Sequence, residues 1–245
     1  MLEAETRVDR PMRIGLVGYG TGGKHFHAPF MMAAEGVELT GIVARAPATI
    51  QSVREDFPDL PVFASLTDMI AAGGIDAVTI TTPPQTRRDL VLEAIEAGLH
   101  VIADKPFAPS AEGARELDAA AKAKGVVLGV FQNRRWDSDI QTLAKVIRDG
   151  SLGKVWRIHS RMDFDDPATL EAGPTGGLLR DLGSHLVDQM LWLLGPAVTV
   201  DAQLDFVDLP QGRTDAGFTI TLRHESGAHS HISASKLNHL NTREL

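Results

Sequence analysis

The sequence contains no cysteine, no long apolar run and too few basic residues to balance its acidic ones. The lack of cysteine excludes disulfides and thiolate metal sites and favours a reducing compartment such as the cytoplasm. Without about 18 consecutive apolar residues, or a basic start followed by an apolar segment, neither a membrane span nor a signal peptide is predicted. A formal net charge of −8 argues against a nucleic-acid partner. These absences predict a soluble, globular, cytoplasmic protein.

The 245 residues suffice for one large domain or two small ones, and the pattern of the chain changes near residue 130. Over 12–130, six short apolar stretches alternate with helical ones, which predicts an α/β fold with a doubly wound parallel sheet of the Rossmann type. Over 131–245, apolar side chains fall on alternate positions, which is typical of an α+β domain with an antiparallel sheet covered on one face. Residues 1–11 are polar and mixed in charge, so a disordered tail is expected.

The helices are predicted from apolar spacing and from residues that commonly begin or end a helix. Ser110 is typical of an N-cap and Gly125 of a C-terminal end, which bounds one helix on both sides. Pro29 is expected to interrupt the helix that follows the first strand. The predicted helices lie at 47–56, 67–72, 85–97, 110–124 and 137–149.

The last part of the chain predicts an incomplete sheet. Only three or four strands of the second sheet fit before Leu245, and residues 233–245 stop within an apparent strand. The alternating residues Val198, Val200, Leu204 and Phe206 are expected to share one face of that sheet. A sheet that ends in this way has an unpaired edge. We therefore expect either a truncated chain or an edge that a second copy of the chain closes.

A glycine pattern, Gly18-x-Gly20-x-x-Gly23, lies directly after the first strand and at the start of a helix. In this context it predicts a dinucleotide site, because the glycines let the turn and its N–H groups approach a pyrophosphate at the helix N-terminus. A plain glycine turn is the alternative. His25 and His27 follow the loop and are expected to cap locally. The predicted cofactor contacts of this loop are Gly18, Tyr19, Gly20, Thr21, Gly22 and Gly23.

The end of the second strand bears on the choice between NAD and NADP. An acidic residue at this position would bind the 2′-hydroxyl of NAD, but the sequence has Ala44 and Arg45 there. An arginine can pair with a 2′-phosphate, and no carboxylate is present to repel it. A solvated arginine is the alternative interpretation. We expect NADP, with NAD as the second choice.

The segment 176–195 is mostly apolar but contains Asp181, His185 and Asp188 at spacings that place them on one helix face. Asp181 and His185 could form a simple surface pair. Their apolar neighbours instead indicate a helix between two layers, where a histidine can take a proton from a substrate hydroxyl. Lys105 follows the fifth strand, at the sheet edge where such folds bind ligands, and could donate to a substrate oxygen. We predict that Lys105, Asp181 and His185 form a catalytic acid–base set.

Other polar residues have less specific patterns. Asn133, Arg134 and Trp136 join the two halves of the chain and are expected to bind substrate, with hinge packing as the alternative. His229 and His231 alternate on one strand and could bind a metal, but a third ligand is lacking and exposed strand residues are the default. No metal site is predicted.

Three motifs resemble the Gfo/Idh/MocA family of oxidoreductases: the glycine pattern, Asp-Lys-Pro at 104–106, and "GGLLRDLGSHLVD" at 176–188. The resemblance implies a Rossmann domain followed by a domain whose open, mostly antiparallel sheet forms a dimer or tetramer. It also implies NAD(P)-dependent oxidation of a sugar or cyclitol hydroxyl. "GYGTGGKHFHAP" and "VFQNRRWDSD" most resemble the NADP-linked scyllo-inositol dehydrogenase branch.

Matched motif to motif, Lys105, Asp181 and His185 occupy the catalytic positions of the family, and Thr82 and Pro83 would flank the cofactor. The chain differs from the family in the aspartate of its Asp-Lys-Pro motif, where glutamate is usual. It also differs in length, because members are usually longer. The function predicted is hydride transfer between a polyol or sugar hydroxyl and NADP. A dinucleotide-binding sensor without turnover is the alternative.

Overall fold

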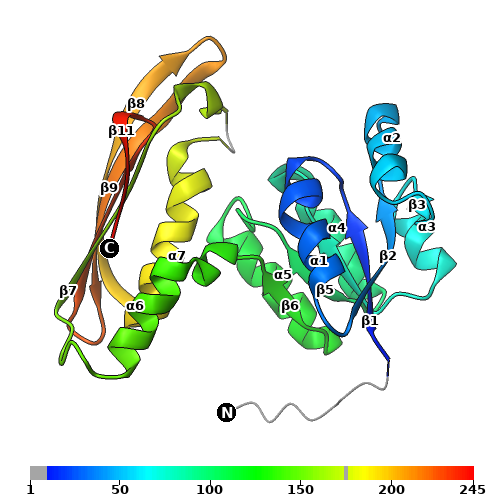
Figure 1. The fold of residues 1–245 in the computed structure, drawn as a ribbon, viewed down its shortest axis with the longest axis horizontal. Coiled ribbons are helices and arrows are strands. Elements are labelled where there is room, and N and C mark those ends of the chain that lie inside the picture. Colours follow the sequence, from blue (N-terminus) through cyan, green and yellow to red (C-terminus); the bar gives the residue numbers. More distant parts are fainter. Residues whose placement is uncertain (1–9, 174–175) are drawn as a thin grey trace. The chain divides into compact units, whose positions relative to one another are not determined.

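The computed structural model describes residues 10–173 and 176–245 (Figure 1). The chain divides into two compact units, with the boundary between Phe131 and Gln132. The predicted tail at 1–11 lies outside the described residues except for its last two. Of these, Arg10 forms an ion pair with Asp76, with 2.6 Å between Arg10 Nη1 and Asp76 Oδ2. Among the described helices, none combines the length and apolar character that a membrane crossing requires.

The first unit contains a parallel sheet in the order β3-β2-β1-β4-β5-β6. The order reverses between β1 and β4, which are hydrogen-bonded neighbours, so the predicted doubly wound sheet is confirmed. Ligands bind such sheets beyond the carboxyl ends of the strands at this reversal. The strands are β1 (Met12–Val17), β2 (Val37–Val43), β3 (Val62–Phe63), β4 (Ala77–Ile80), β5 (His100–Ala103) and β6 (Leu128–Val130).

The helices of the first unit follow the predicted positions within a residue or two. Ser110 Oγ accepts a hydrogen bond from the Gly113 amide at 3.1 Å, and Gly125 ends the same helix in the left-handed conformation. A π-helical turn, η1 (Gly22–His27), precedes α1 (Ala28–Ala33), and Pro29 lies in the first turn of α1. The other helices are α2 (Pro47–Asp56), α3 (Leu66–Ala72), α4 (Pro84–Glu96) and α5 (Ala111–Lys124). Buried aliphatic clusters fill both faces of the sheet.

The second unit contains a mixed sheet in the order β11-β7-β10-β9-β8, with β7 and β10 parallel and the other pairs antiparallel. Five strands are present among the described residues, so the prediction of three or four was wrong. The additional strand is β11, which pairs at the edge with β7. The strands are β7 (Arg157–Asp165), β8 (Ala197–Leu209), β9 (Gly212–His224), β10 (His229–Ser235) and β11 (Leu237–Glu244).

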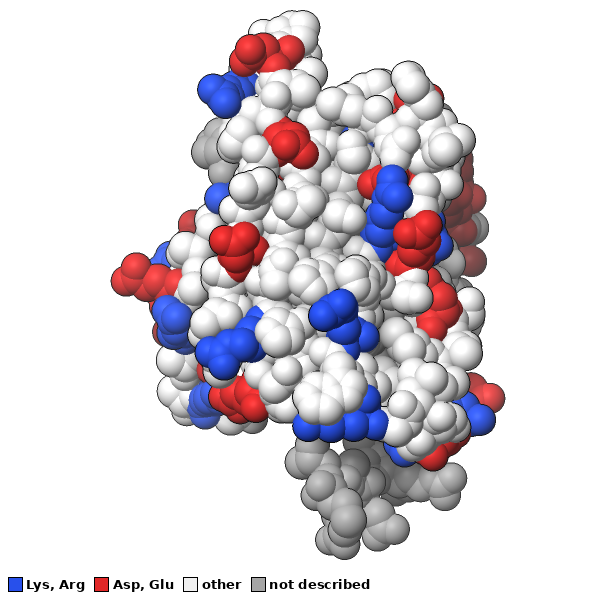
Figure 2. Space-filling model, turned by 90° about the vertical axis from the view of Figure 1, so that its left-hand side faces the viewer, with Lys and Arg blue, Asp and Glu red and all other residues white. Residues whose placement is uncertain are grey.

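Helices cover one face of this sheet (Figure 1). Leu186 and Met190 of α7 pack with the fully buried Phe218 and Ile232 of the sheet. The opposite face, seen in Figure 2, displays mostly uncharged residues over its centre. The helical segments are η2 (Asn133–Trp136), α6 (Ser138–Arg148), η3 (Pro167–Thr169), η4 (Leu179–Gly183) and α7 (Ser184–Leu194).

Strand β8 differs from the alternation expected for it. Val198, Val200 and Phe206 are 48%, 68% and 50% exposed, whereas Leu204 packs partly against the core. No register shift separates Val200 from Leu204, so they share a side, but β8 is an edge strand and only Leu204 of these residues packs against the core. Phe206 follows a register shift between Asp205 and Phe206. A register shift of this kind reverses the side on which the following residues point.

Candidate functional site

The turn between β1 and η1 has the geometry of a phosphate-binding loop. Gly18 adopts a positive φ of 97°, and a Cβ atom on Gly23 would collide with the Gly18 carbonyl oxygen. A Cβ atom on Gly20 would meet nothing within 4 Å. Gly18 and Gly23 therefore serve the turn and its packing. Gly20 borders open space, so a ligand phosphate can approach the backbone there closely.

A cavity of about 670 Å³ lies beside this turn in the first unit. Its size suits a nucleotide portion. The predicted cofactor residues Thr21, Gly22, Gly23, Pro83 and Lys105 do not line it. The predicted residues that do are Gly18, Tyr19, Gly20, Ala44, Arg45 and Thr82.

A polar network that sequence reasoning missed attaches the glycine turn to α2. The Tyr19 hydroxyl donates to Asp56 at 2.8 Å, and Lys24 Nζ lies 2.7 Å from the same carboxylate. Lys24 also donates to Ser52 Oγ at 2.8 Å. Lys24 first, and then Tyr19, hold the pKa of Asp56 below its usual value, while burial and the Asp56 contact raise the pKa of Tyr19. The network fixes Tyr19 at the wall of the cavity.

The loop that contains Lys105 is held by a buried guanidinium. Arg87 of α4 is 2% exposed and donates to the carbonyl oxygens of Thr82 and Asp104 at 2.6 Å each, and also to that of Pro106. Burial lowers the pKa of Arg87, and the nearby Asp104 charge opposes that shift. Arg87 thus joins the loops after β4 and β5, with Lys105 between two of its acceptors.

Asp104, the residue before Lys105, is also fixed. Its carboxylate accepts from the Lys105 amide at 2.7 Å, and its other oxygen lies 3.5 Å from His27 Nε2. Burial would raise the pKa of Asp104, but the His27 ring, the Lys105 amide and the Arg87 charge together hold it below its usual value. His27 is buried, with its ring centroid 4.0 Å from that of Phe131. The expectation that His27 caps a helix was wrong, since its side chain makes no cap hydrogen bond.

In the second unit, η4 and α7 form the helix that contains the acidic residues and the histidine. His185 is 5% exposed, whereas the Asp181 side chain is 51% exposed. Asp188 forms two hydrogen bonds with Arg135 of η2, at 2.7 and 2.5 Å. Asp188 therefore ties the helix to η2, a role distinct from the one proposed for Asp181 and His185.

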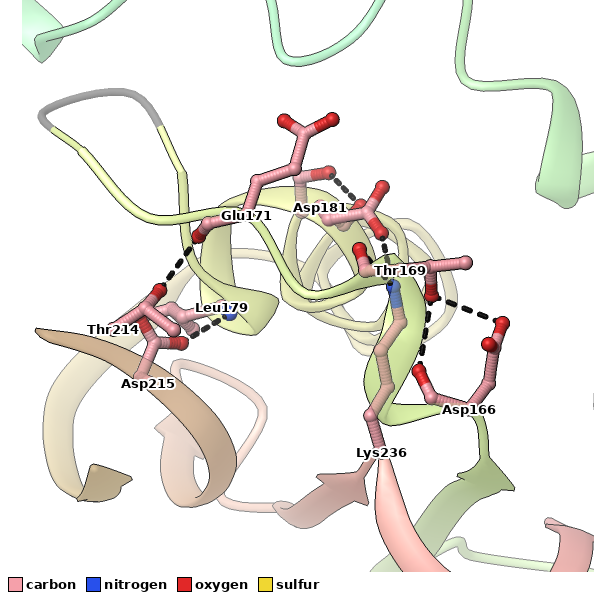
Figure 3. A network of polar contacts seen from close by, with 9 residues as sticks. Asp166, Thr169, Glu171, Leu179, Asp181, Thr214, Asp215 and Lys236 are labelled. Atoms are coloured by element: carbon pink, nitrogen blue, oxygen red, sulfur yellow. Dashed lines mark hydrogen bonds and ion pairs between the residues drawn. The ribbon is translucent and has the colours of Figure 1, made fainter. Parts of the chain in front are cut away.

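The start of this helix is held by a side chain from the sheet. Asp215 of β9 accepts from the Leu179 amide at 2.7 Å, and Gly177, two residues before Leu179, has a positive φ of 98°. A Cβ atom at Gly177 would collide with the Asp215 carboxylate. Thr214 donates to the Glu171 carbonyl oxygen at 2.7 Å (Figure 3). These contacts set the position of Asp181 on the first turns.

Lys236 lies beside Asp181, and no sequence motif indicated it. Lys236 Nζ is 3.2 Å from Asp181 Oδ2 and 3.3 Å from the Thr169 carbonyl oxygen (Figure 3). Asp181 and Lys236 are 55 residues apart in the chain. Only the long-range pairing of the sheet brings them together, so no local signal could have found the lysine.

The remaining predicted residues have varied surroundings. Arg134 pairs with Asp137 at 3.0 Å and lines a cavity of about 520 Å³, which Asn133 and Trp136 do not line. The Trp136 side chain is 79% exposed. The His231 ring stacks on that of His159 at 4.8 Å. Within the described ranges, no group of three or more histidine, aspartate or glutamate side chains is arranged to hold a metal ion.

The sequence matches two family models. Residues 12–132 match the oxidoreductase family with an NAD-binding Rossmann fold, and residues 140–244 match the Gfo/Idh/MocA C-terminal domain. The chain belongs to the Gfo/Idh/MocA family of NAD(P)-binding oxidoreductases. The resemblance predicted from the three motifs is confirmed, and the C-terminal domain of the family is present.

Known relatives agree with this assignment. An uncharacterized oxidoreductase, YdgJ of Escherichia coli (strain K12), is 39% identical over 213 residues, covering 85% of this chain and 59% of the relative. The scyllo-inositol 2-dehydrogenase (NADP(+)) IolW of Bacillus subtilis (strain 168) is 33% identical over 83% of this chain and 57% of its own length. The chain thus spans somewhat less than three fifths of each of these relatives.

A solved structure shows the same fold with a ligand. An oxidoreductase from Agrobacterium radiobacter, in complex with NAD+, L-tartaric acid and magnesium, superposes with a TM-score of 0.87 at 26% identity. The match covers 95% of this chain and 68% of that one. The relatives named thus include one described as NADP-linked and one solved with NAD+.

Proposed function

We propose that the protein is a dehydrogenase that oxidises a secondary hydroxyl of a polyol or sugar and prefers NADP. The observation that carries the proposal is the cavity of about 670 Å³ beside the open Gly20 turn, with Arg45 at its wall. The NADP-linked inositol dehydrogenase among the relatives supports both the substrate class and the cofactor.

The cofactor would be held by the loop residues Gly18 to Gly23, with Thr82 and Pro83 near it and Ala44 and Arg45 at the adenosine end. When bound, NADP supplies a hydride acceptor. Arg45 is exposed, and the end of β2 bears no carboxylate that would repel a 2′-phosphate. Charge-assisted hydrogen bonds to that phosphate would give the preference for NADP.

In this proposal, Lys105, Asp181 and His185 form the catalytic set. His185 takes the proton of the substrate hydroxyl, and Lys105 donates a hydrogen bond to the oxygen as negative charge develops on it. Asp181 binds a substrate hydroxyl and orients the imidazole. Asn133, Arg134 and Trp136 are proposed to contact substrate.

Two measurements test the proposal. Calorimetric titration with NADP and NAD should show tighter NADP binding, and Arg45→Ala should remove about 10- to 100-fold of that preference. A reduction assay with inositols and sugars should detect turnover that His185→Ala abolishes while NADP still binds. The control is His239→Ala, because the His239 side chain is 93% exposed. NADP binding with no turnover on any substrate would instead indicate a sensor.

We also propose that the uncovered face of the second sheet binds a second copy of this chain. The strand register places Asp201 and Asp205 of the edge strand β8 on the same side of the sheet as Arg157 and Arg161 of β7, and all four are exposed. A twofold axis along the strands would place the acidic strand of one copy over the basic strand of the other, so the face is complementary to itself.

The oligomeric state in solution tests this surface. Light scattering after size exclusion should give a dimer or tetramer, which Asp201→Lys weakens and which high salt also weakens. Combining Asp201→Lys with Arg157→Asp should restore part of the association. A monomer at all concentrations, or no effect of either substitution, would reject this surface.

A further inference from the structure

Lys236 is a buried lysine that the proposed reaction has not used. It directly follows β10, and its side chain is 11% exposed. Its amide donates to the Ala216 carbonyl oxygen at 3.0 Å, and its carbonyl oxygen accepts from the Asp166 amide at 3.2 Å. The backbone of Lys236 is therefore held by β9 on one side and by the end of β7 on the other, which fixes where its side chain begins.

The Lys236 ammonium reaches the residue proposed to bind substrate. It contacts Asp181 Oδ2 at 3.2 Å and the Thr169 carbonyl oxygen at 3.3 Å. Figure 3 shows the lysine side chain extending from the sheet to the turn that bears Asp181. The two partners differ in exposure, since the Asp181 side chain is 51% exposed. The Lys236 side chain is thus buried in the unit, whereas the Asp181 carboxylate is accessible to a ligand.

A buried ion pair is weak evidence for stability. Removing an ammonium from water costs several kcal/mol, and the attraction to one half-exposed carboxylate does little more than offset that cost. An apolar side chain of similar length could fill the same space. A buried cation next to a proposed substrate-binding carboxylate fits a functional role better.

The charges of the pair cancel, and two acidic residues, Asp166 and Glu171, lie on the neighbouring segments. Glu171 lies on the segment before the helix, and Figure 3 shows its carboxylate pointing away from the pair. Asp166 accepts from the Thr169 hydroxyl at 2.9 Å on the other side. Lys236 is the cation paired with Asp181 in this group, and it neutralises that carboxylate. Because Lys236 neutralises Asp181, the pair offers no net positive charge to a ligand that carries its own negative charge.

We propose that Lys236 is a positioning residue that orients and neutralises Asp181, so that the site accepts an uncharged polyol or sugar and disfavours a sugar acid. This inference rests on the proposed function, because Asp181 is taken as the residue that binds a substrate hydroxyl. The carboxylate offers an acceptor to that hydroxyl, and the lysine holds the carboxylate in one orientation.

Substitution of Lys236 tests the positioning role. Lys236→Met should lower kcat/KM for a neutral substrate by about 10- to 100-fold, because a charged hydrogen bond that orients the carboxylate is lost. The affinity for NADP should not change, since its proposed residues lie in the first unit. Lys236→Arg keeps the charge and should recover much of the activity. The matched control is Lys145→Met, whose lysine is 73% exposed and pairs with Asp149.

The charge of the substrate provides a readout that a purely structural role would not change. The matched probes are glucose and glucuronate, which differ by one carboxylate. Wild type should favour glucose, and Asp181→Asn should shift the remaining preference toward glucuronate because it leaves the lysine charge uncompensated. Lys236→Met should shift the preference the opposite way. Equal losses for both probes, or a wild-type preference for glucuronate, would overturn the inference.

Calorimetric binding of the same two sugars separates this inference from the proposed function. Suppose that Asp181→Asn and Lys236→Met shift the binding preference between glucose and glucuronate in opposite directions, while wild type turns over neither sugar. This result would support the role of Lys236 and reject only the dehydrogenase proposal. Turnover with no charge-dependent shift in either variant would reject the role of Lys236 alone. If wild type neither binds nor oxidises either sugar, both are rejected.

Discussion

Replacing Arg87 by methionine is the most direct test of how the Lys105 loop is held. Methionine has a similar length, so the substitution removes the guanidinium with little change in volume. In the native protein, Arg87 is 2% exposed and serves three carbonyl oxygens from two loops. Water cannot readily replace a donor at so buried a position, so the three carbonyl groups would lose their donor together.

The expected magnitude follows from these contacts. Each buried carbonyl left without a donor costs about 1–3 kcal/mol, and the removed cation no longer carries its own desolvation penalty. We expect a net loss of about 3–5 kcal/mol in the free energy of unfolding, a large part of the about 5–15 kcal/mol typical of a domain. Arg87→Lys keeps the charge but lacks the planar fork, so its loss should be intermediate.

Urea unfolding followed by circular dichroism measures this effect, with turnover measured in parallel. The matched control is the next residue, Arg88→Met, whose exposed guanidinium pairs with Asp89 and Glu116 and whose loss should leave the midpoint unchanged. Where enough Arg87→Met folds at low temperature, it should turn over slowly, because Lys105 is no longer fixed. Equal effects of the two substitutions on the midpoint would refute the reasoning.

Three further predictions concern stability. Arg10 first, and then a backbone amide, hold the pKa of Asp76 well below its usual value, so its contribution exists above the unfolded pKa of about 3.9 and is lost as the pH falls. The unfolding midpoints of wild type and Asp76→Asn should therefore differ most at pH 7, and the difference should shrink steadily as the pH falls from about 4 to 2; a constant difference would contradict this. Gly177→Ala should cost about 1–3 kcal/mol in thermal unfolding, because the new methyl group displaces the Asp215 carboxylate from its amide partner. Asp188→Asn should weaken the two hydrogen bonds to its guanidinium partner and lower the melting temperature while KM is unchanged; a raised KM would place this residue in the substrate site.

Local patterns predicted the framework of this protein because the interactions that form it are local. The helix bounded by Ser110 and Gly125 lies where its capping residues place it, since a cap involves neighbours three or four residues away. The glycine turn could be predicted for the same reason, because its steric requirement concerns only the strand before it and the helix after it. The apolar stretches of the first unit predicted a parallel sheet, because a doubly covered sheet needs continuous apolar strands.

Tertiary structure alone decided which polar side chains meet. His27 was expected to cap a helix but lies buried beside Asp104 of the loop after β5 and against the Phe131 ring. Lys236 and Asp181 come from the end of a strand and the start of a helix, and their contact depends on strand register and on the packing of that helix. Periodicity records which face of an element is apolar, but not the partner that covers it. Contacts between distant segments are determined by how whole elements pack, and a single sequence contains no local signal for them.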